Sequence, residues 1–222
     1  MRRTLSLLAI GLFVGAGLTG CDPFGPPSVV VAYRSDFEGA IESVWSLQRT
    51  ETTPVGDRTF LGPFNNEILN FKLPDLPPHK RVEVVFDLFI MGSWEGNASV
   101  DPRGRAVGPD VWRLSAASGP ELIQTTFSNV GFIERYDHQA YPDSYPDGDH
   151  PARTGADESN SLGYLHNFPD LGVGTRPVDT VYNLTFSFEH DGALLWLVFE
   201  GSGLTGHGDE GWGLDNVTIR LR

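Results

Sequence analysis

Acidic side chains carry most of the chemistry that this sequence could perform. The chain of 222 residues has 29 Asp and Glu against 16 Lys and Arg, which gives a formal charge of -13. Calcium binds roughly six to eight oxygen atoms from carboxylates, Asn side chains and backbone carbonyls. Asp36 and Glu38 near the beginning, and Asp215 and Asn216 near the end, offer such oxygens and would meet if the first and last strands pair. We therefore predict a structural Ca²⁺ site at these four residues.

Two further acidic groups are weaker candidates for the same ion. Asp87, Asn97 and Asp110 belong to a segment in which a strand end runs into a polar turn and then returns. Asp143 to Asp149 imitates part of an EF-hand loop, but a Tyr and a Thr stand where that loop needs oxygen-rich ligands. As an alternative for both groups, Asp, Asn and Gly form turns without any ion.

The sequence lacks the common local signatures of catalysis. It contains no G-x-S-x-G, no H-E-x-x-H, no phosphate loop and no dinucleotide fingerprint. None of the six His has another His three to five residues away, which disfavours zinc binding on one local element. Paired carboxylates still leave a glycan-processing enzyme open as an alternative, with Asp147 and Glu158 as the residues to test. We assign no catalytic residue.

Aromatic residues beside the acidic loops predict a ligand-binding surface. A sugar ring stacks on an aromatic face while its hydroxyl groups bond to carboxylates and amides, so carbohydrate is the first candidate ligand. The predicted ligand-binding residues are Trp94, Tyr141, Asp143, Tyr145, Asp147 and Trp212. Burial in the core is the alternative for any Trp, and we expect it for Trp112 and Trp196, which lie on strand-like runs.

The N-terminus has the parts of an export signal. Arg2 and Arg3 precede a short apolar run, and the sequence from Leu18 to Cys21 resembles the lipoprotein box of bacteria. The resemblance implies a signal peptide at residues 1–20 and a lipidated Cys21, the single cysteine of the chain. Residues 21–28 are expected to form a Pro- and Gly-rich tether. The expected location is the bacterial cell envelope, outside the cytoplasm, with the membrane as a partner through the lipid anchor.

The remaining chain predicts an all-β fold. Its 26 Gly and 16 Pro disfavour long helices, and residues 182–188 and 216–221 alternate between apolar and polar side chains as half-buried strands do. We expect one antiparallel β-sandwich domain over residues 29–222, with a long loop at 134–176. Further expected strands are residues 29–33, 43–49, 67–73, 82–90, 111–116, 122–127 and 193–199. The acidic balance excludes nucleic acid as a partner.

Several short motifs resemble those of extracellular jelly-roll modules. They are Asp36-Phe37-Glu38-Gly39 with Trp45, Phe86-Asp87-Leu88, the segments Ser93–Asn97 and Gly108–Asp110, and Asp209–Val217. The chain is similar in these motifs to MAM-like and carbohydrate-binding-module-like β-sandwiches. The resemblance implies a two-sheet antiparallel jelly roll of the concanavalin or galactose-binding type. It also implies neighbouring first and last strands and a calcium ion held by Asp36 or Glu38 with Asp215.

These observations together predict a lipid-anchored, non-catalytic binding module. Its calcium-stabilised jelly roll would bind carbohydrate or another ligand of the envelope surface. A glycan-processing enzyme and a structural or adhesion protein of the envelope are the alternatives.

Overall fold

The computed structural model describes residues 29–100, 104, 106–133, 138–169, 172–206 and 208–222. The described residues form β-strands and loops and contain no α-helix, which confirms the predicted fold class. None of them lies in a helix long and apolar enough to cross a membrane. The predicted signal peptide, the lipidated Cys21 and the tether lie outside the described residues.

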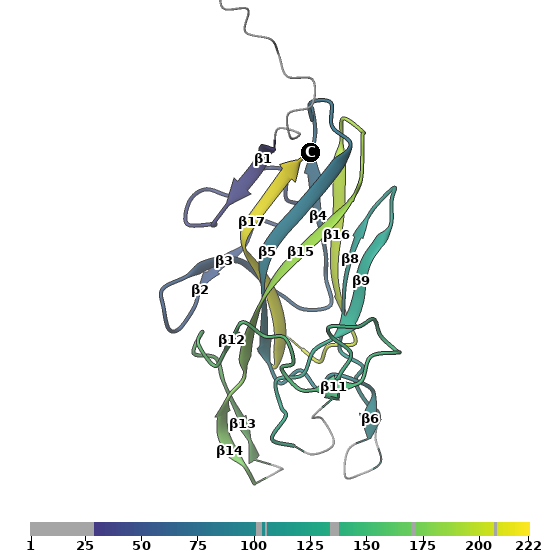
Figure 1. Ribbon diagram of the computed structural model, residues 1–222. Helices are drawn as coiled ribbons and strands as arrows, with labels where there is room; N and C mark the ends of the chain where they lie inside the picture. Colours follow the sequence, from purple (N-terminus) through teal and green to yellow (C-terminus); the bar gives the residue numbers. More distant parts are fainter. Residues whose placement is uncertain (1–28, 101–103, 105, 134–137, 170–171, 207) are drawn as a thin grey trace, which may run out of the picture.

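The larger of two main sheets has seven strands, and its long strands β5, β15 and β17 run side by side (Figure 1). Its order is β12-β15-β5-β17-β3-β2, and β1 also pairs with β17. All its pairings are antiparallel. The strands are β1 (Val30–Ser35), β2 (Thr50–Thr52), β3 (Thr59–Phe64), β5 (Arg81–Gly92), β12 (Glu158–Ser159), β15 (Asp179–Glu189) and β17 (Glu210–Leu221).

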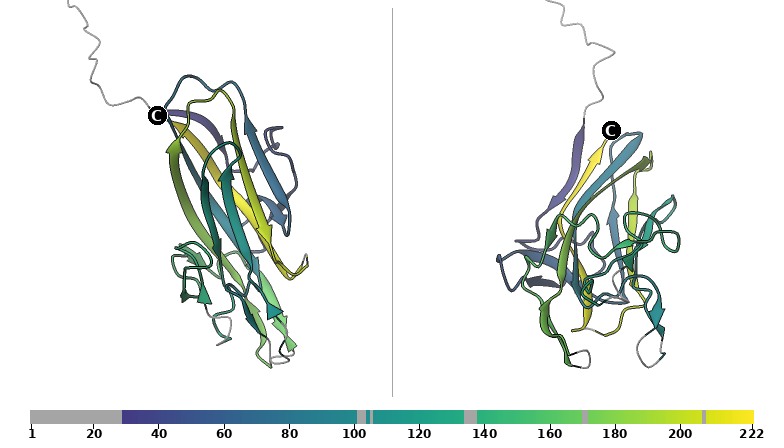
Figure 2. Two further views of the ribbon diagram at one scale, coloured as in Figure 1. Left: turned by 90° about the vertical axis from the view of Figure 1, so that its right-hand side faces the viewer. Right: turned by 60° about the horizontal axis from the view of Figure 1, so that its bottom comes forward.

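The second main sheet is antiparallel and has the order β4-β16-β8-β9. Its strands are β4 (Ile68–Leu73), β8 (Val111–Ala116), β9 (Glu121–Thr126) and β16 (Leu195–Ser202). The two sheets face each other as a sandwich (Figure 2). Three small hairpins extend from one end: β6 (Ser99–Val100) with β7 (Ala106–Val107), β10 (His138–Gln139) with β11 (His150–Pro151), and β13 (Leu165–Phe168) with β14 (Gly174–Pro177).

Aromatic side chains fill the space between the two main sheets. The ring centroid of Trp112 on β8 lies 6.2 Å from that of Trp212 on β17 and 6.3 Å from that of Phe199 on β16. All three side chains are fully buried. The predicted alternation of residues 182–188 and 216–221 is confirmed, since the apolar members are buried apart from the half-buried Phe186. Burial of such large side chains supplies the main stabilisation of the fold.

Strand β17 joins the two ends of the domain. Its C-terminal half pairs with β1, from Val30 opposite Leu221 to Ser35 opposite Val217, so the predicted pairing of first and last strands is confirmed. Its N-terminal half pairs with β3 instead. The register against β5 shifts between Asp215 and Thr218, where Asn216 has a positive φ of 52°. This β-bulge places Asn216 and Val217 opposite a single residue of β5, directly after the facing pair Asp215 and Asp87.

The structure differs from four local expectations. Residues 43–49 form no strand, and only Trp45 makes an isolated bridge, to Phe71. Strand β3 was not expected, because its Gly-Pro pair is typical of turns. Trp196 is 37 % exposed instead of buried, since the apolar run of β16 places it on the outer face, where the ammonium of Lys72 lies 3.9 Å from its ring centroid. The expected long loop at 134–176 contributes strands β10 to β14.

Candidate metal centre and adjoining pocket

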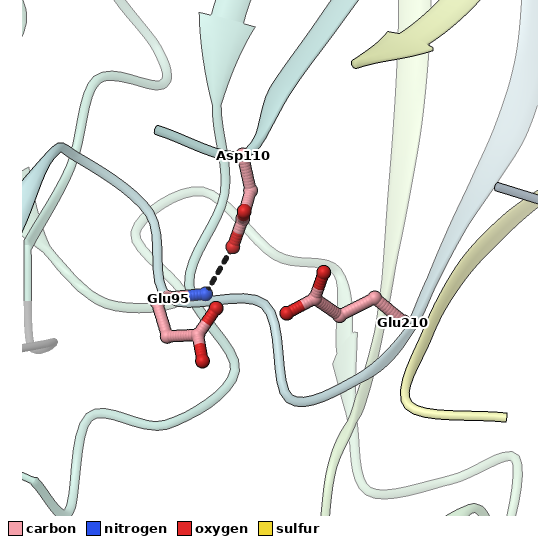
Figure 3. Close-up of side chains that lie close together, drawn as sticks. All are labelled: Glu95, Asp110 and Glu210. Carbon is pink, nitrogen blue, oxygen red and sulfur yellow. Dashed lines mark hydrogen bonds between the residues drawn. The ribbon is translucent and has the colours of Figure 1, made fainter. Parts of the chain in front are cut away.

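Three acidic side chains converge at the end of the sandwich that carries the small hairpins. Glu95 follows β5, Asp110 immediately precedes β8, and Glu210 is the first residue of β17. One carboxylate oxygen from each lies within 4.8 Å of the other two. Figure 3 shows the three carboxylates pointing toward one another. We call this group the acidic triad, and among the described residues it is the one cluster of this kind.

Backbone hydrogen bonds hold the three loops of the acidic triad together. The amide of Glu95 donates to the carboxylate of Asp110, and the amide of Asp110 donates to the carbonyl of Gly96 at 3.0 Å. The amide of Ser93 donates to the carbonyl of Asp209 at 2.9 Å. Three segments that are distant in sequence are therefore fixed against one another.

Two glycines permit this close approach. A Cβ at Gly92, where φ is 88°, would lie 1.7 Å from the carbonyl oxygen of Asp209. A Cβ at Gly96, where φ is 78°, would lie 2.1 Å from the carbonyl oxygen of His138. Both positions therefore require the missing side chain and the backbone freedom of glycine.

Burial leaves part of the acidic triad without hydrogen-bond partners. Asp110 is 1 % exposed and Glu210 is 2 % exposed. One oxygen of Glu210 accepts the amide of Thr205, but its Oε1 is buried and unpartnered, as is Oε2 of Glu95. A buried carboxylate oxygen without a partner is costly. A bound cation or shared protons would remove this cost.

The surroundings of the acidic triad favour protonated carboxyl groups when no cation is bound. Burial, followed by the neighbouring carboxyl group of Glu210, raises the pKa of Glu95 to about 11. Burial and the charge of Glu210 raise the pKa of Asp110 to about 7. A divalent cation would displace these protons, because it interacts only with the ionised carboxylates.

These pKa shifts predict how stability depends on pH in a chelator. A folded-state pKa above the unfolded one means that the folded state holds extra protons between the two values, so stability falls as pH rises through that window. For Asp110 the window runs from pH 3.8 to about pH 7. For Glu95 it runs from pH 4.5 to about pH 11. We expect a higher melting temperature at about pH 5 than at about pH 8.

Glu95→Gln is the matching variant, because the amide imitates the neutral carboxyl group. Its melting temperature in chelator should change less between the two pH values than that of the unmodified protein. A residual slope of the same sign is expected from Asp215, whose pKa burial raises to about 6. An unchanged slope in Glu95→Gln would contradict this account of the acidic triad.

The donor set of the acidic triad suits a hard divalent cation. All three side chains offer carboxylate oxygens, which suit calcium, magnesium and manganese. Magnesium keeps several water molecules and demands near-ideal octahedral geometry, whereas calcium accepts irregular sites with more protein oxygens. The burial of Asp110 and Glu210 therefore favours calcium, and it favours an ion that fixes loops over one that meets a substrate.

A pocket of about 230 Å³ adjoins the acidic triad and shares Glu210 with it. It is bounded by six segments of the chain. Its lining residues are Glu51, Pro63, Phe64, Met91, Gly92, Tyr164, Leu165, His166, Val178 and the segment from Gly208 to Gly211.

Asp209 connects the acidic triad to the pocket wall. Its carboxylate accepts the hydroxyl groups of Ser93 at 2.6 Å and Thr205 at 2.8 Å. Nδ1 of His166 lies 3.2 Å from the same carboxylate. The loop that carries Glu210 is thereby tied to the loop after β5 and to β13.

The first predicted calcium set is placed differently. Asp215 accepts from the guanidinium of Arg58 at 3.3 Å, the carboxylate of Glu38 accepts the amide of Thr59 at 2.8 Å, and that of Asp36 accepts the amide of Glu38 at 3.3 Å. The described residues place Asp36, Glu38 and Asp215 in no group of ligand atoms like the acidic triad. A guanidinium, which no sequence spacing indicated, thus stands against Asp215.

Asn216 of the first predicted calcium set and the three residues of the second set do not form one site. Asn216 donates to Asp87 at 2.8 Å, and Arg58 donates to Asp87 at 3.0 Å, so Asp87 belongs to the Arg58 network. Asn97 accepts the hydroxyl of Thr126 and donates to the carbonyl of Gly148. Only Asp110 of the second set belongs to the acidic triad. In the EF-hand-like stretch, Asp143 bonds to His150 at 2.8 Å, and His138 bonds to Asp149.

The predicted ligand-binding aromatics are mostly internal. Trp94 and Trp212 are fully buried. Their indole N–H groups donate to the carbonyls of Gly211 and Asn65, so neither ring has a free polar group in the core. This corrects the prediction that these two rings face a ligand. Tyr141 is half-buried, with its ring centroid 5.2 Å from that of Phe127.

The other members of the predicted ligand surface are more accessible. Tyr145 is half-buried, whereas Asp143 and Asp147 are exposed. Glu158, considered for the alternative enzyme, forms an ion pair with Arg58.

Two members of the acidic triad were not among the three ligands named for the second predicted set. Glu95 lies in the polar turn that this set spans. Glu210 lies outside every predicted set, although it begins β17 beside an alternating apolar run. Its position directly before Gly211 and the buried Trp212 was the available signal. Comparisons with protein-family models, curated proteins and solved structures gave no match to this chain.

Proposed function

We propose that this chain is a calcium-stabilised β-sandwich binding module, anchored by lipid to the bacterial envelope. The acidic triad carries the proposal, because two of its buried carboxylate oxygens have no hydrogen-bond partner. A cation would satisfy both of them. The proposed ion joins the loop after β5, the start of β8 and the start of β17. It would thereby hold in place the loops that surround the adjoining pocket.

The position of Val30 relative to Glu210 supports a module that presents the hairpin end of the sandwich to ligands. Val30 pairs with Leu221, so the beginning of the described domain lies at the opposite end of β17 from Glu210. A strand of this length spans about 36 Å. A tether before Val30 would hold that end near the membrane, and the pocket would point away from it.

Carbohydrate or another envelope-surface ligand is the proposed binding partner. Exposed Asp143 and Asp147 with half-buried Tyr145 remain as candidate contacts near the loop end, since Gly148 bonds to Asn97 in the turn of Glu95. The likeness to MAM-like and carbohydrate-binding-module-like jelly rolls belongs to the same proposal. No described contact favours the enzyme alternative.

A test uses residues 22–222, which include every described strand. Metal analysis of the purified protein should find about one calcium per chain after dialysis against calcium. A glycan panel should then show binding that disappears in chelator. Absence of bound metal would refute the calcium-stabilised module. Calcium without glycan binding would exclude carbohydrate and direct the search to other surface ligands.

A further inference from the structure

We propose that the pocket beside the acidic triad binds a primary ammonium group carried on an apolar stem. A free polyamine and a lysine side chain both have this chemistry. The inference deepens the proposed function, since it names the ligand class of the module's loop end. It rests on the calcium proposal in one respect, namely that the ion fixes one wall of the pocket.

The deep wall of the pocket is apolar. Phe64 and Val178 are fully buried, and Met91 is 4 % exposed. Leu165, which is 67 % exposed, adds an apolar side chain at the outer part of the lining. Such a surface would release water when it contacts an alkyl chain of a few carbons, and this contact favours binding.

The polar part of the lining is acidic. Glu51 and Asp209 contribute carboxylates that the acidic triad does not use, His166 lies 3.2 Å from Asp209, and the lining residues that the structure describes include neither Lys nor Arg. Arg49 contacts the ring of Phe64 and the carbonyl of Pro63, but its charge is paired with Glu67. An anionic ligand would therefore meet like charges, whereas a cation would meet opposite charges.

Glu51 is positioned to accept one hydrogen bond of an ammonium group. Its Oε1 accepts the hydroxyl of Tyr164 at 2.8 Å, which fixes the carboxylate at the pocket wall. Burial and the nearby carboxylate of Glu51 raise the pKa of Tyr164, so its hydroxyl stays a donor to Glu51. An ammonium group has three donors, and Glu51 and Asp209 both line the pocket as acceptors.

Calcium and the amine should support each other's binding. The segment from Gly208 to Gly211 is a pocket wall, and its Glu210 side chain belongs to the acidic triad. An ion at the triad would fix this wall in the shape that contacts the ligand. Calcium should then strengthen amine binding, and the amine should strengthen calcium binding by the same factor.

Calorimetric titration of residues 22–222 tests the inference. Cadaverine represents free polyamines, and Nα-acetyl-lysine amide represents a lysine side chain. 1-Pentanol and Nα,Nε-diacetyl-lysine amide are uncharged controls of similar size. We expect at least one amine to bind with calcium present and both controls to fail, and the stronger amine indicates the source. Absence of binding by both amines to calcium-loaded protein, or equal binding of the controls, would overturn the proposal.

Glu51→Gln is the informative variant. Gln keeps an acceptor for Tyr164 but removes the charge, so amine affinity should fall about tenfold. Glu189 is exposed at the end of β15 that is distant in sequence from Val178 of the pocket lining. Glu189→Gln should therefore leave the amine affinity unchanged. Equal affinity in Glu51→Gln and the unmodified protein would contradict the assigned role of Glu51.

Separate calcium titrations distinguish failure of this inference from failure of the proposed function. Glu51→Gln should bind calcium as the unmodified protein does, because Glu51 lies outside the acidic triad. Calcium binding without amine binding would refute only the ligand inference. Amine binding without calcium binding would refute the calcium proposal and the coupling, while supporting the ligand class.

Discussion

Removal of calcium should lower the melting temperature of residues 22–222 by about 10 °C at about pH 8. The ion would bind only the folded state, where the loops bring Glu95, Asp110 and Glu210 together. A ligand at about a thousand times its dissociation constant stabilises the folded state by about 4 kcal/mol. Differential scanning calorimetry in millimolar calcium and in chelator measures the difference. Equal melting temperatures in the two buffers would refute the site.

Variants of the acidic triad separate the cation site from general effects of charge. Glu95→Gln should lose most of the calcium-dependent shift, because one ligand charge is removed. In chelator its melting temperature should stay close to that of the unmodified protein at about pH 5 and exceed it at about pH 8, because Gln, unlike the protonated Glu95, takes up no proton on folding. Glu210→Gln should also lose the shift, and some loss of stability in chelator is expected, because the amide oxygen of Gln is a weaker acceptor than a carboxylate for the amide of Thr205.

Two control variants test the calcium sets that were predicted from sequence. Asp147→Asn removes an exposed carboxylate from the EF-hand-like stretch and should retain the full calcium shift. Asp215→Asn should also retain the shift, because Asp215 bonds to Arg58 and lies outside the acidic triad. Loss of the calcium shift in Asp215→Asn, with the shift retained in Glu95→Gln, would move the ion to the set at the chain ends.

The strands could be predicted because their signal is local. In β15, each position from Tyr182 to Phe188 shows its face through the residue type itself, and the structure confirms that alternation. The pairing of β1 with β17 was implied by the resemblance of the motifs near both ends to jelly-roll modules, and the structure confirms it. Strand β3 carries a Gly-Pro pair that hides its pattern, so its pairing with β17 was not foreseeable from local residues.

The candidate site was harder to predict because it depends on contacts between distant segments. Asp110 and Glu95 share one region of the sequence, but Glu210 joins them only because β17 lies beside β5. Burial of Trp94 and Trp212 likewise depends on carbonyls of other segments that accept their indole N–H groups. The residue types predicted correctly which segments are turns and loops. The direction in which each side chain points could not be predicted, because it depends on the complete fold.

The Arg58 network provides the second large expected effect. The guanidinium lies between Asp87, Asp215 and Glu158, and its carbon is 4.5 Å from the ring centroid of Phe89. Asp87 and Asp215 are opposite each other on β5 and β17, with side chains 14 % and 6 % exposed. Two carboxylates so close together in a partly dry environment repel each other unless a cation separates them.

Replacing Arg58 by Met should therefore lower the free energy of unfolding by about 2–3 kcal/mol at about pH 8, because it leaves two facing, largely buried carboxylates without the cation that lies between them. The loss should be smaller at about pH 5. Burial already raises the pKa of Asp215 to about 6, and Arg58 lowers it, so the variant should have a still higher value. Below that pKa, Asp215 is neutral and needs no partner. Urea unfolding at the two pH values measures both effects.

Arg113→Met is the matched control for the loss of a charged side chain on a strand pair. Arg113 pairs with Glu200 and Glu121 on the second sheet, and its side chain is 39 % exposed. Arg113→Met should lower the free energy of unfolding by no more than about 1 kcal/mol at either pH. Adding Asp215→Asn to Arg58→Met should recover part of the lost stability, because it removes one of the facing charges. A loss in Arg58→Met that is independent of pH would show that packing on Phe89, and not charge, explains the role of Arg58.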